Sequence, residues 1–375
     1  MKRTLIFIAI FASLTLSTSA GEELVRQRID SKDAAFRLVR LVGGIPNPWS
    51  FAFLPGGDVL ITQRSGKLWR LNGEGKTVEI GGLPEVLAAG QGGLLDILLH
   101  PDYAGKGWIY ITHSVSTASG GATAVSRARL AGDRLTDTER IFTANNGGGT
   151  TRHFGSRLAF DNEGYLYVTL GDRGEDTRAQ DTADHAGSTL RLFDDGSIPP
   201  DNPFAAGSSG ADEIYSWGHR NAQGMVFDPV TERIWLNEHG AKGGDEVNIL
   251  RKGANYGWPV ISYGTHYSGA KIGVGTSASG MVQPELYWDP SIAPSGMEVY
   301  TGDAFPAWRG DLFVGALKAQ QLRRLVRKGG EIVEQEVLLQ GVIGRIRDVR
   351  QGPDGLLYLL TDERNGGLYR LEPAG

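Results

Sequence analysis

The chain of 375 residues carries 38 basic and 43 acidic side chains, a formal net charge of −5, and contains no cysteine. Disulfides, thiolate catalysis and cysteine-ligated metals are therefore excluded, and the acidic balance argues against a broad nucleic-acid-binding surface. The 54 glycines and the short apolar runs favour many short strands over long helices.

The first twenty residues have the layout of a cleavable signal peptide. Lys2 and Arg3 precede an apolar run at 5–16, and small residues follow at 18–20. The run is too short to span a bilayer comfortably, so a retained anchor is the less favoured alternative. We expect residues 1–20 to direct export to the periplasm or out of the cell. Residues 21–375 are expected to form one domain, because no linker rich in Pro, Ser or charge divides them.

A repeated unit dominates the rest of the sequence. Each copy is an alternating apolar run, a tight turn built from Pro, Gly, Asp or Asn, and a second apolar run. The six copies are Ser50–Arg70, Leu94–Ser114, Ser156–Gly171, Gln223–Glu238, Met297–Leu317 and Ile346–Asp362. Repeats of this size predict an all-β fold, a six-bladed β-propeller with four-stranded antiparallel blades.

Three further segments bear on how the ring closes and on the number of blades. Phe36–Val42 alternates like a strand before the first hairpin, and Gly367–Leu371 has the pattern of a final strand. We expect the N-terminal strand to complete the last sheet, which leaves no unpaired edge at the seam. Ala122–Phe142 is interpreted as the outer strands of the second blade; the alternative is a degenerate further copy of the repeat.

Conspicuous polar residues flank the hairpins at one end. Because a hairpin starts and finishes at the same end, a ring of hairpins brings these residues to one face. They are Gln91, His153, Asp172, Arg220, Asn221, Gly240, Lys318, Arg345 and Arg347. We therefore predict a functional site on that face. Arg64, at the exit of the first hairpin, receives no role.

The third hairpin carries the strongest indication of chemistry. His153 enters at the predicted rim and Asp172 returns beside it. A carboxylate next to an imidazole fixes its tautomer, which is how a general base is prepared. The alternative is a rim histidine that only holds a loop together, and the residues alone favour neither interpretation.

Cations gather around the predicted funnel. Strand alternation sends Arg345 and Arg347 to one face, and Lys318 adds a third charge. This set favours a ligand with several carboxylates or phosphates, whereas the alternative is an ion-pair network with Asp348 or Asp303. Arg220 and Asn221 are suited to adjacent oxygens of a planar ligand. The glycines around Gly240 would expose backbone carbonyls, which are good calcium ligands.

Several motifs together resemble the soluble pyrroloquinoline quinone (PQQ)-dependent sugar dehydrogenases, and in particular the periplasmic aldose sugar dehydrogenases. They occur in order from about Val39 to Leu371 and cover nearly the whole mature chain. They include Gly90–Leu95, Arg152–Gly155, Gly218–Asn221, Glu238–Gly240, Gly244–Asn248, Asn255–Pro259 and Arg345–Asp348. The resemblance implies a six-bladed propeller that oxidises aldoses to lactones, with PQQ and calcium as cofactors.

The resemblance also implies a role for each matching position. His153 is similar to the general base, Asp172 to the carboxylate that orients it, and Arg220 to the group that polarises the quinone oxygen. The positions similar to other PQQ contacts are Gln91, Asn221, Tyr267, Lys318, Arg345 and Arg347. Gly240 and Ala241 resemble carbonyl ligands of the calcium that contacts PQQ, and Glu246 and Tyr256 resemble a second, structural calcium site.

Two other functions are weighed against this one. A calcium-dependent propeller lactonase would need carboxylates gathered around a metal in the central channel. A non-catalytic propeller that binds carbohydrate or protein would not require His153, Asp172 and Arg220 to face one cavity. For the leading hypothesis we expect an aldose substrate, an external electron acceptor, a monomer or homodimer, and no nucleic-acid partner or membrane span in the mature chain.

Overall fold

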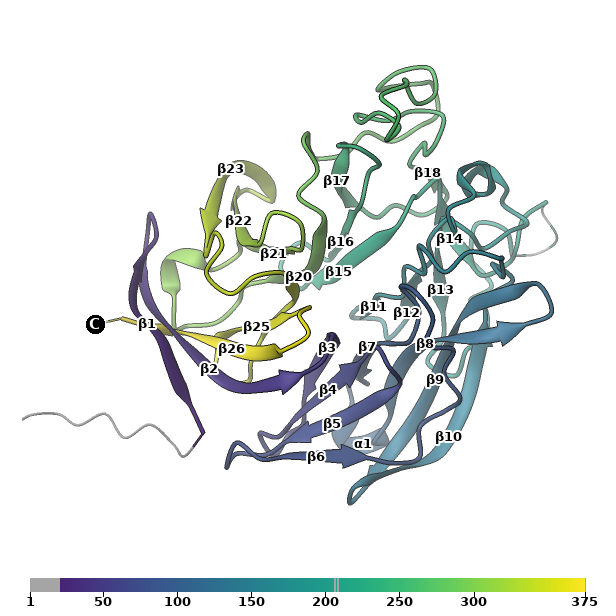
Figure 1. The fold of residues 1–375 in the computed structure, drawn as a ribbon. Coiled ribbons are helices and arrows are strands. Elements are labelled where there is room, and N and C mark those ends of the chain that lie inside the picture. Colours follow the sequence, from purple (N-terminus) through teal and green to yellow (C-terminus); the bar gives the residue numbers. More distant parts are fainter. Residues whose placement is uncertain (1–20, 206, 208, 375) are drawn as a thin grey trace, which may run out of the picture.

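The computed structural model describes residues 21–205, 207 and 209–374, so the predicted signal peptide at 1–20 lies outside the described residues. The described chain forms six twisted sheets around a central axis (Figure 1). This arrangement confirms the predicted all-β, six-bladed β-propeller. Its helical segments are short: α1 (Tyr103–Lys106) and the 3-10 turns η1 (Asp176–Gln180) and η2 (Pro306–Trp308). None of the described helices is long and apolar enough to cross a membrane.

The first three blades follow one another along the chain. Blade 1 contains β3 (Pro48–Phe53), β4 (Val59–Gln63), β5 (Lys67–Leu71) and β6 (Thr77–Ile80). Blade 2 contains β7 (Leu94–Leu99), β8 (Ile109–Thr117), β9 (Gly120–Ala131) and β10 (Arg134–Thr143). Blade 3 contains β11 (Leu158–Phe160), β12 (Leu166–Thr169), β13 (Ser188–Leu192), β14 (Ile214–Trp217) and the short parallel strand β18 (Ala254–Asn255). Because β9 and β10 belong to blade 2, Ala122–Phe142 is confirmed as outer strands.

The other three blades complete the ring. Blade 4 contains β15 (Ala222–Asp228), β16 (Arg233–Glu238), β17 (Asp245–Ile249) and β19 (Leu286–Trp288). Blade 5 contains β20 (Pro294–Val299), β21 (Leu312–Ala316), β22 (Gln321–Lys328) and β23 (Glu331–Leu338). Blade 6 contains β24 (Ile346–Gln351), β25 (Leu357–Thr361), β26 (Gly366–Pro373), β2 (Ala35–Ile45) and β1 (Glu23–Asp30). Each predicted hairpin supplies the first two strands of one blade.

The N-terminal strand closes the ring as expected. Antiparallel pairing joins β2 to β26, with Leu38 opposite Leu371 and Phe36 opposite Pro373. The innermost strands β3, β7, β11, β15, β20 and β24 contact one another in this order, and β24 returns to β3 (Figure 1). The two ends of the described chain are thereby fixed in one sheet, and β2 covers the edge that β26 would otherwise leave unpaired at the seam.

The hydrophobic core consists of layers between neighbouring blades. Blades 5 and 6 enclose Trp308, Phe313 and Leu359, and the other five blade pairs enclose similar clusters. Because a blade is covered on both faces, its central strands bury successive side chains rather than every second one, as in β25. Each fully buried large side chain contributes about 1.5–3 kcal/mol to stability, so the layers hold the inner strands, and the residues at their ends, in place.

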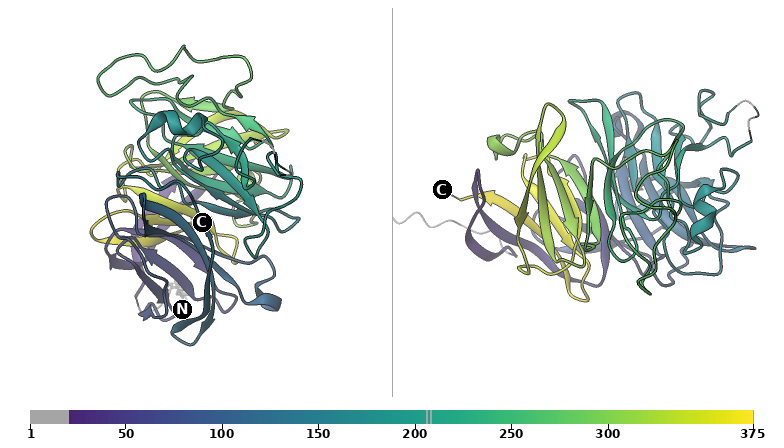
Figure 2. Two further views of the ribbon diagram at one scale, coloured as in Figure 1. Left: turned by 90° about the vertical axis from the view of Figure 1, so that its right-hand side faces the viewer. Right: turned by 90° about the horizontal axis from the view of Figure 1, so that it is seen from above.

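Long connections extend from this frame. Figure 2 shows the segment between β18 and β19 (green) as a loop outside the ring of sheets. The inner strands all run in the same direction, because each begins its blade. One end of the channel therefore collects the residues that precede these strands, and the other end collects the hairpin turns.

Candidate active site

A cavity of about 160 Å³ lies where the inner strands begin. Its charged lining consists of Arg64, Arg345, Arg347 and Asp362, and its other polar lining includes Gln91, Asn221, Gln223 and His239. Burial lowers the pKa of His239 to about 4, so this imidazole is uncharged at neutral pH. The cavity thus has three cations against one anion.

His153 and Asp172 meet beside this cavity. Nδ1 of His153 donates to Oδ1 of Asp172 over 2.6 Å, and both side chains are buried. The backbone N–H of His153 donates to Oε1 of Gln91 over 2.8 Å, which ties the pair to the cavity wall. Within the described residues, Nε2 of His153 has no hydrogen-bond partner. The arrangement leaves that nitrogen available to accept a proton from a substrate.

Local backbone geometry explains how the pair is held. His153 has φ +51°, the left-handed region that non-glycine residues enter at a cost. Gly171 precedes Asp172, and a Cβ at this position would overlap the carbonyl oxygen of His153. Glycine at 171 therefore lets the two segments approach until the side chains of His153 and Asp172 meet.

The electrostatics keep the histidine neutral and the aspartate charged. Burial lowers the pKa of His153 below its ordinary value, and this outweighs the hydrogen bond to Asp172, which raises it. Burial by itself would raise the pKa of Asp172, but the hydrogen bond and charge of His153 and the N–H of Gly174 lower it overall. A neutral imidazole with Nδ1–H on a carboxylate has its lone pair on Nε2.

Arg220 lies next to the pair. Its carbonyl accepts from the backbone N–H of Asp172 over 2.9 Å, and its own N–H donates to Glu238 over 2.7 Å. Nη1 of its guanidinium donates to the carbonyl of Gly240 over 2.5 Å, and the group lies 5.2 Å from the ring centre of Trp258. The predicted trio of His153, Asp172 and Arg220 is therefore assembled at one place.

The cationic wall of the cavity comes from the start of β24. Nη2 of Arg347 donates to Asp362 over 2.7 Å and Nη1 donates to Gln223 over 3.0 Å, while its buried Nε has no hydrogen-bond partner in the part of the chain that the structure describes. Among the described residues, Nη1 of Arg345 reaches only the carbonyl of Leu317, at 3.4 Å. Arg64 completes the cationic wall. Burial by itself would raise the pKa of Asp362, but the charge and hydrogen bond of Arg347, and then the charge of Arg64, lower it overall.

Arg345 and Arg347 do not form the alternative ion-pair network with Asp348 or Asp303. Asp348 binds Arg157 and Arg350 further along the channel, and Asp303 pairs with Arg309. Asp362 is the carboxylate that faces Arg347. One anion cannot balance three cations, so the cavity is suited to an anionic ligand with more than one negative charge.

The two predicted calcium sites differ in the ligand groups that they provide. The carbonyl of Gly240 accepts from Arg220 and keeps a second lone pair, and Ala241 follows it in a buried loop. Glu246 lies beside Glu238 in a small cavity of about 10 Å³, and burial together with that neighbour raises the pKa of Glu246 to about 8. The hydroxyl of Tyr256 donates instead to the carbonyl of Ile249. No group of three or more His, Asp or Glu in the described part of the chain has the arrangement of a metal site.

Two predicted cofactor contacts do not line the cavity. Lys318 follows β21 at the exposed rim, next to the lining residue Leu317. Tyr267 is 75% exposed on the loop between β18 and β19, and it does not line the cavity. The structure therefore brings together Gln91, Asn221, Arg345 and Arg347, but not these two.

Sequence analysis missed three residues of the site. Nε1 of Trp258 donates to Oδ2 of Asp172 over 2.9 Å, and so fixes the second oxygen of that carboxylate. Asp362 and Arg64 line the cavity from the ends of β25 and β4. Their place in the repeat could have identified Asp362 and Arg64. Each directly follows the second strand of a hairpin, at the same end of the propeller as Asp172.

Fold and site together define a propeller protein in which a buried histidine–aspartate pair lies beside a cavity lined by three arginines and one aspartate. Residues 45–370 match the family described as glucose/sorbosone dehydrogenase. The chain belongs to this family of oxidoreductases, which confirms the resemblance drawn from the motifs.

Individual relatives agree with this assignment. The aldose sugar dehydrogenase YliI of Escherichia coli is 44% identical over 337 residues, covering 88% of this chain and 91% of that protein. The apo structure of the soluble aldose sugar dehydrogenase of E. coli has a TM-score of 0.88 at 42% identity, covering 90% and 99% of the two chains. The PQQ-bound aldose sugar dehydrogenase of Streptomyces coelicolor has a TM-score of 0.73 at 28% identity, covering 94% and 98%.

Proposed function

We propose that this protein oxidises aldoses at the anomeric carbon to lactones, with PQQ as hydride acceptor and calcium as Lewis acid. One observation carries the proposal: a neutral His153, oriented by Asp172, lies beside a cavity with three arginines and one aspartate. We also propose that the mature chain acts in the periplasm or outside the cell, as a monomer or homodimer.

The cavity residues fit PQQ, which is a tricarboxylate. Arg345, Arg347 and Arg64 would bind its carboxylates, and the unpartnered Nε of Arg347 is a donor directed at no protein group. Gln91 and Asn221 offer amide groups on the same wall. The PQQ-bound neighbour named above supports the same cofactor.

The protein's own residues account for removal of the substrate's proton and for stabilisation of the negative charge that develops. Nε2 of His153 takes the proton of the anomeric hydroxyl, and Asp172 stabilises the imidazolium that forms. Trp258 and the N–H of Gly174 hold Asp172 in place, so the imidazole keeps its tautomer. Arg220 provides positive charge where negative charge develops. When bound, PQQ supplies the hydride acceptor.

Calcium fits the Gly240 loop through carbonyl oxygen, the ligand it prefers. Gly240 and Ala241 would hold the ion near Arg220, where it would stabilise developing negative charge. Glu246, whose pKa is raised by burial and by the neighbouring Glu238, would belong to a second calcium site together with Tyr256.

The two alternatives have less support. A lactonase needs free carboxylates around a metal in the channel, and Asp96 and Asp348 there bind arginines. A non-catalytic propeller gives no reason for an oriented, neutral histidine beside a cationic cavity.

Steady-state assays test the proposed function. Purified protein incubated with PQQ and calcium should reduce an artificial dye when glucose or another aldose is added, and omission of PQQ should abolish the reaction. A panel of mono- and disaccharides with no dye reduction at all would refute the proposal.

Arg64 is expected to contribute to cofactor binding. Arg64→Gln should raise the Kd of PQQ about tenfold, because one charge-assisted contact of about 1.4 kcal/mol is lost. Equilibrium dialysis of the apoprotein measures this. Arg70→Gln is the matched control and should leave the Kd of PQQ unchanged. Arg70 lies on β5, away from the cavity, and pairs with Asp133. An equal Kd for Arg64→Gln and wild type would remove Arg64 from the site.

The pH profile should report His153. The neutral imidazole is the active form, so activity is lost as pH falls through the pKa of His153. Because burial lowers that pKa, the acidic limb of kcat/KM should lie below 6.5, the ordinary histidine value. An acidic limb centred above 6.5 would contradict a buried, neutral base.

A further inference from the structure

The segment that carries His153 has a strained backbone. The φ of His153 is +51°, and Gly155 (φ +62°) and Ser156 (φ +87°) are also left-handed. His153 and Ser156 are not glycine, so both enter this region at a cost. Without a restraint, the backbone at His153 would relax toward a negative φ and carry the imidazole away from Asp172. The contacts of this segment therefore determine whether the histidine–aspartate pair forms.

The peptide group that enters His153 is held on both sides. Its carbonyl, which belongs to Arg152, accepts from Nη1 of Arg173, and its N–H donates to Oε1 of Gln91 over 2.8 Å. This peptide has no other hydrogen bond to the described ranges, 21–205, 207 and 209–374. The orientation of the peptide plane relative to the Cα of His153 is the quantity that φ measures. The two hydrogen bonds therefore fix the left-handed conformation.

Arg173 contacts the segment at several points. Its Nη2 donates to the carbonyl of Thr150 over 2.9 Å and to the carbonyl of Gly121, on β9, over 3.3 Å. Its guanidinium also lies 3.5 Å from the ring centre of Phe154, the residue after His153. The guanidinium thus contacts both chain neighbours of His153 and connects them to blade 2.

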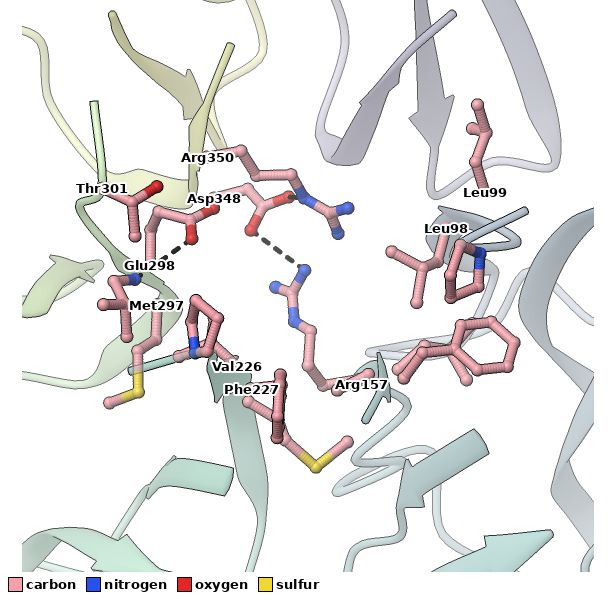
Figure 3. A pocket seen from close by; sticks show the side chains of 17 residues that line it. Leu98, Leu99, Arg157, Val226, Phe227, Met297, Glu298, Thr301, Asp348 and Arg350 are labelled. Carbon is pink, nitrogen blue, oxygen red and sulfur yellow. Dashed lines mark hydrogen bonds and ion pairs between the residues drawn. The ribbon is translucent and has the colours of Figure 1, made fainter. Parts of the chain in front are cut away.

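Arg173 carries a buried charge with which no carboxylate pairs. The residue is 0% exposed, and in the described chain it forms no ion pair and its Nε has no hydrogen-bond partner. Burial, and then the charge of Arg178, lower its pKa to about 10, so the guanidinium stays charged at neutral pH. By contrast, Arg157 and Arg350, at a second cavity where the inner strands end, both bind Asp348, over 2.9 and 3.1 Å (Figure 3). A buried cation without an ion pair is costly, and the groups that compensate it here lie mostly in the segment of His153.

We propose that Arg173 positions the base: its guanidinium holds the peptide before His153 in the orientation that places the imidazole against Asp172. The consequence for catalysis rests on the proposed function, whereas the placement of the imidazole does not. Arg173 does not line the cavity, so it acts only through His153.

Two variants separate the donors of Arg173 from its bulk. Arg173→Met keeps a long chain against Phe154 but has no donor, and Arg173→Lys keeps the charge but lacks the planar fork that serves several carbonyls. In the apoprotein, without cofactor or sugar, ¹⁵N chemical shifts should report Nδ1–H alone for His153 of wild type. Arg173→Met should show a mixture of both tautomers, and Arg173→Lys a smaller share of Nε2–H.

Kinetics measure the consequence for catalysis. We expect kcat for aldose oxidation to fall on the order of 10²-fold in Arg173→Met and about tenfold in Arg173→Lys, because a misplacement of about 1 Å is enough for such losses. The Kd of PQQ should stay within a factor of about two, since the arginines that line the cavity are untouched. A residue that only stabilised the fold would lower the unfolding temperature and leave both kcat and the tautomer of His153 unchanged.

Arg127→Met is the matched control. Arg127 also donates to a carbonyl of a neighbouring blade, that of Asp194, over 2.9 Å, and its guanidinium lies 4.4 Å from the ring centre of Trp108. It lies opposite Tyr110, at the hairpin-turn end of blade 2, so its loss should change neither kcat nor the spectrum of His153.

Thermal unfolding shows whether each variant folds, and Arg173→Lys decides the matter if Arg173→Met does not fold. Wild-type ¹⁵N shifts or wild-type kcat in every folded Arg173 variant would overturn the inference, as would a tautomer mixture already present in the wild type. A wild-type protein that oxidises no aldose would refute the proposed function instead, and the ¹⁵N spectra would still decide whether Arg173 holds His153.

Discussion

Replacement of His153 by glutamine is expected to lower kcat for aldose oxidation by about 10²–10⁴-fold, the usual contribution of a general base. Glutamine can still donate to Asp172, so the carboxylate keeps a partner, but it cannot take the proton of the anomeric hydroxyl. The Kd of PQQ should stay within a factor of about two, since the arginines of the cavity are untouched. Dye-linked kinetics together with PQQ titration separate the two effects.

The chain offers a matched control for this variant. His100 is also buried and paired with an aspartate, Asp194, but it lies at the hairpin-turn end of β7. His100→Gln should leave kcat unchanged, apart from any loss of folded protein. Near-normal turnover in the His153→Gln protein would show that the base is another group.

Asp172→Asn is the second substitution with a large expected effect. Nε1 of Trp258 donates to Oδ2 of Asp172, and the amide oxygen of asparagine can keep this hydrogen bond, so asparagine should occupy nearly the same place although the N–H of Gly174 loses its acceptor at Oδ1. Its amide N–H₂ can donate to Nδ1 of His153, which leaves the proton on Nε2 and produces the wrong tautomer. We expect kcat to fall by about 10²–10⁴-fold, as for other histidine bases that lose their orienting carboxylate.

Two measurements distinguish this tautomer effect from general damage. ¹⁵N chemical shifts of the imidazole should report Nδ1–H in wild type and Nε2–H in the Asp172→Asn protein. Asp194→Asn, which changes the partner of His100, should alter neither kcat nor the spectrum of His153. Unchanged Nδ1 protonation with full activity in Asp172→Asn would refute the orienting role.

The fold was predictable because its signals are local. Each hairpin carries its own turn residues and apolar alternation, and the closure of the ring followed from a strand pattern at each end of the chain. The meeting of His153 and Asp172 was also predictable, since both flank one hairpin. The register then brings the ends of β11 and β12 together.

The remaining parts of the site depend on contacts between distant segments. Trp258 reaches Asp172 across 86 positions of sequence, from a segment beyond β18 that has no periodic pattern. Asp362 rather than Asp348 faces Arg347, because Arg157 and Arg350 already engage Asp348 deeper in the channel. The assignment of Tyr267 to the cofactor stays a prediction from motif resemblance, since no local pattern fixes the course of its long loop.

Reduction of bound PQQ by a sugar tests the central claim most directly. The calcium-loaded apoprotein is titrated with PQQ under anaerobic conditions, an aldose is added without dye, and the absorption of the bound quinone is followed in a stopped-flow instrument. The account predicts saturable PQQ binding and a loss of quinone absorption with aldose, fast in wild type and at least about a hundredfold slower in His153→Gln. Absence of PQQ binding, or bound PQQ that stays oxidised with every aldose tried, would contradict it.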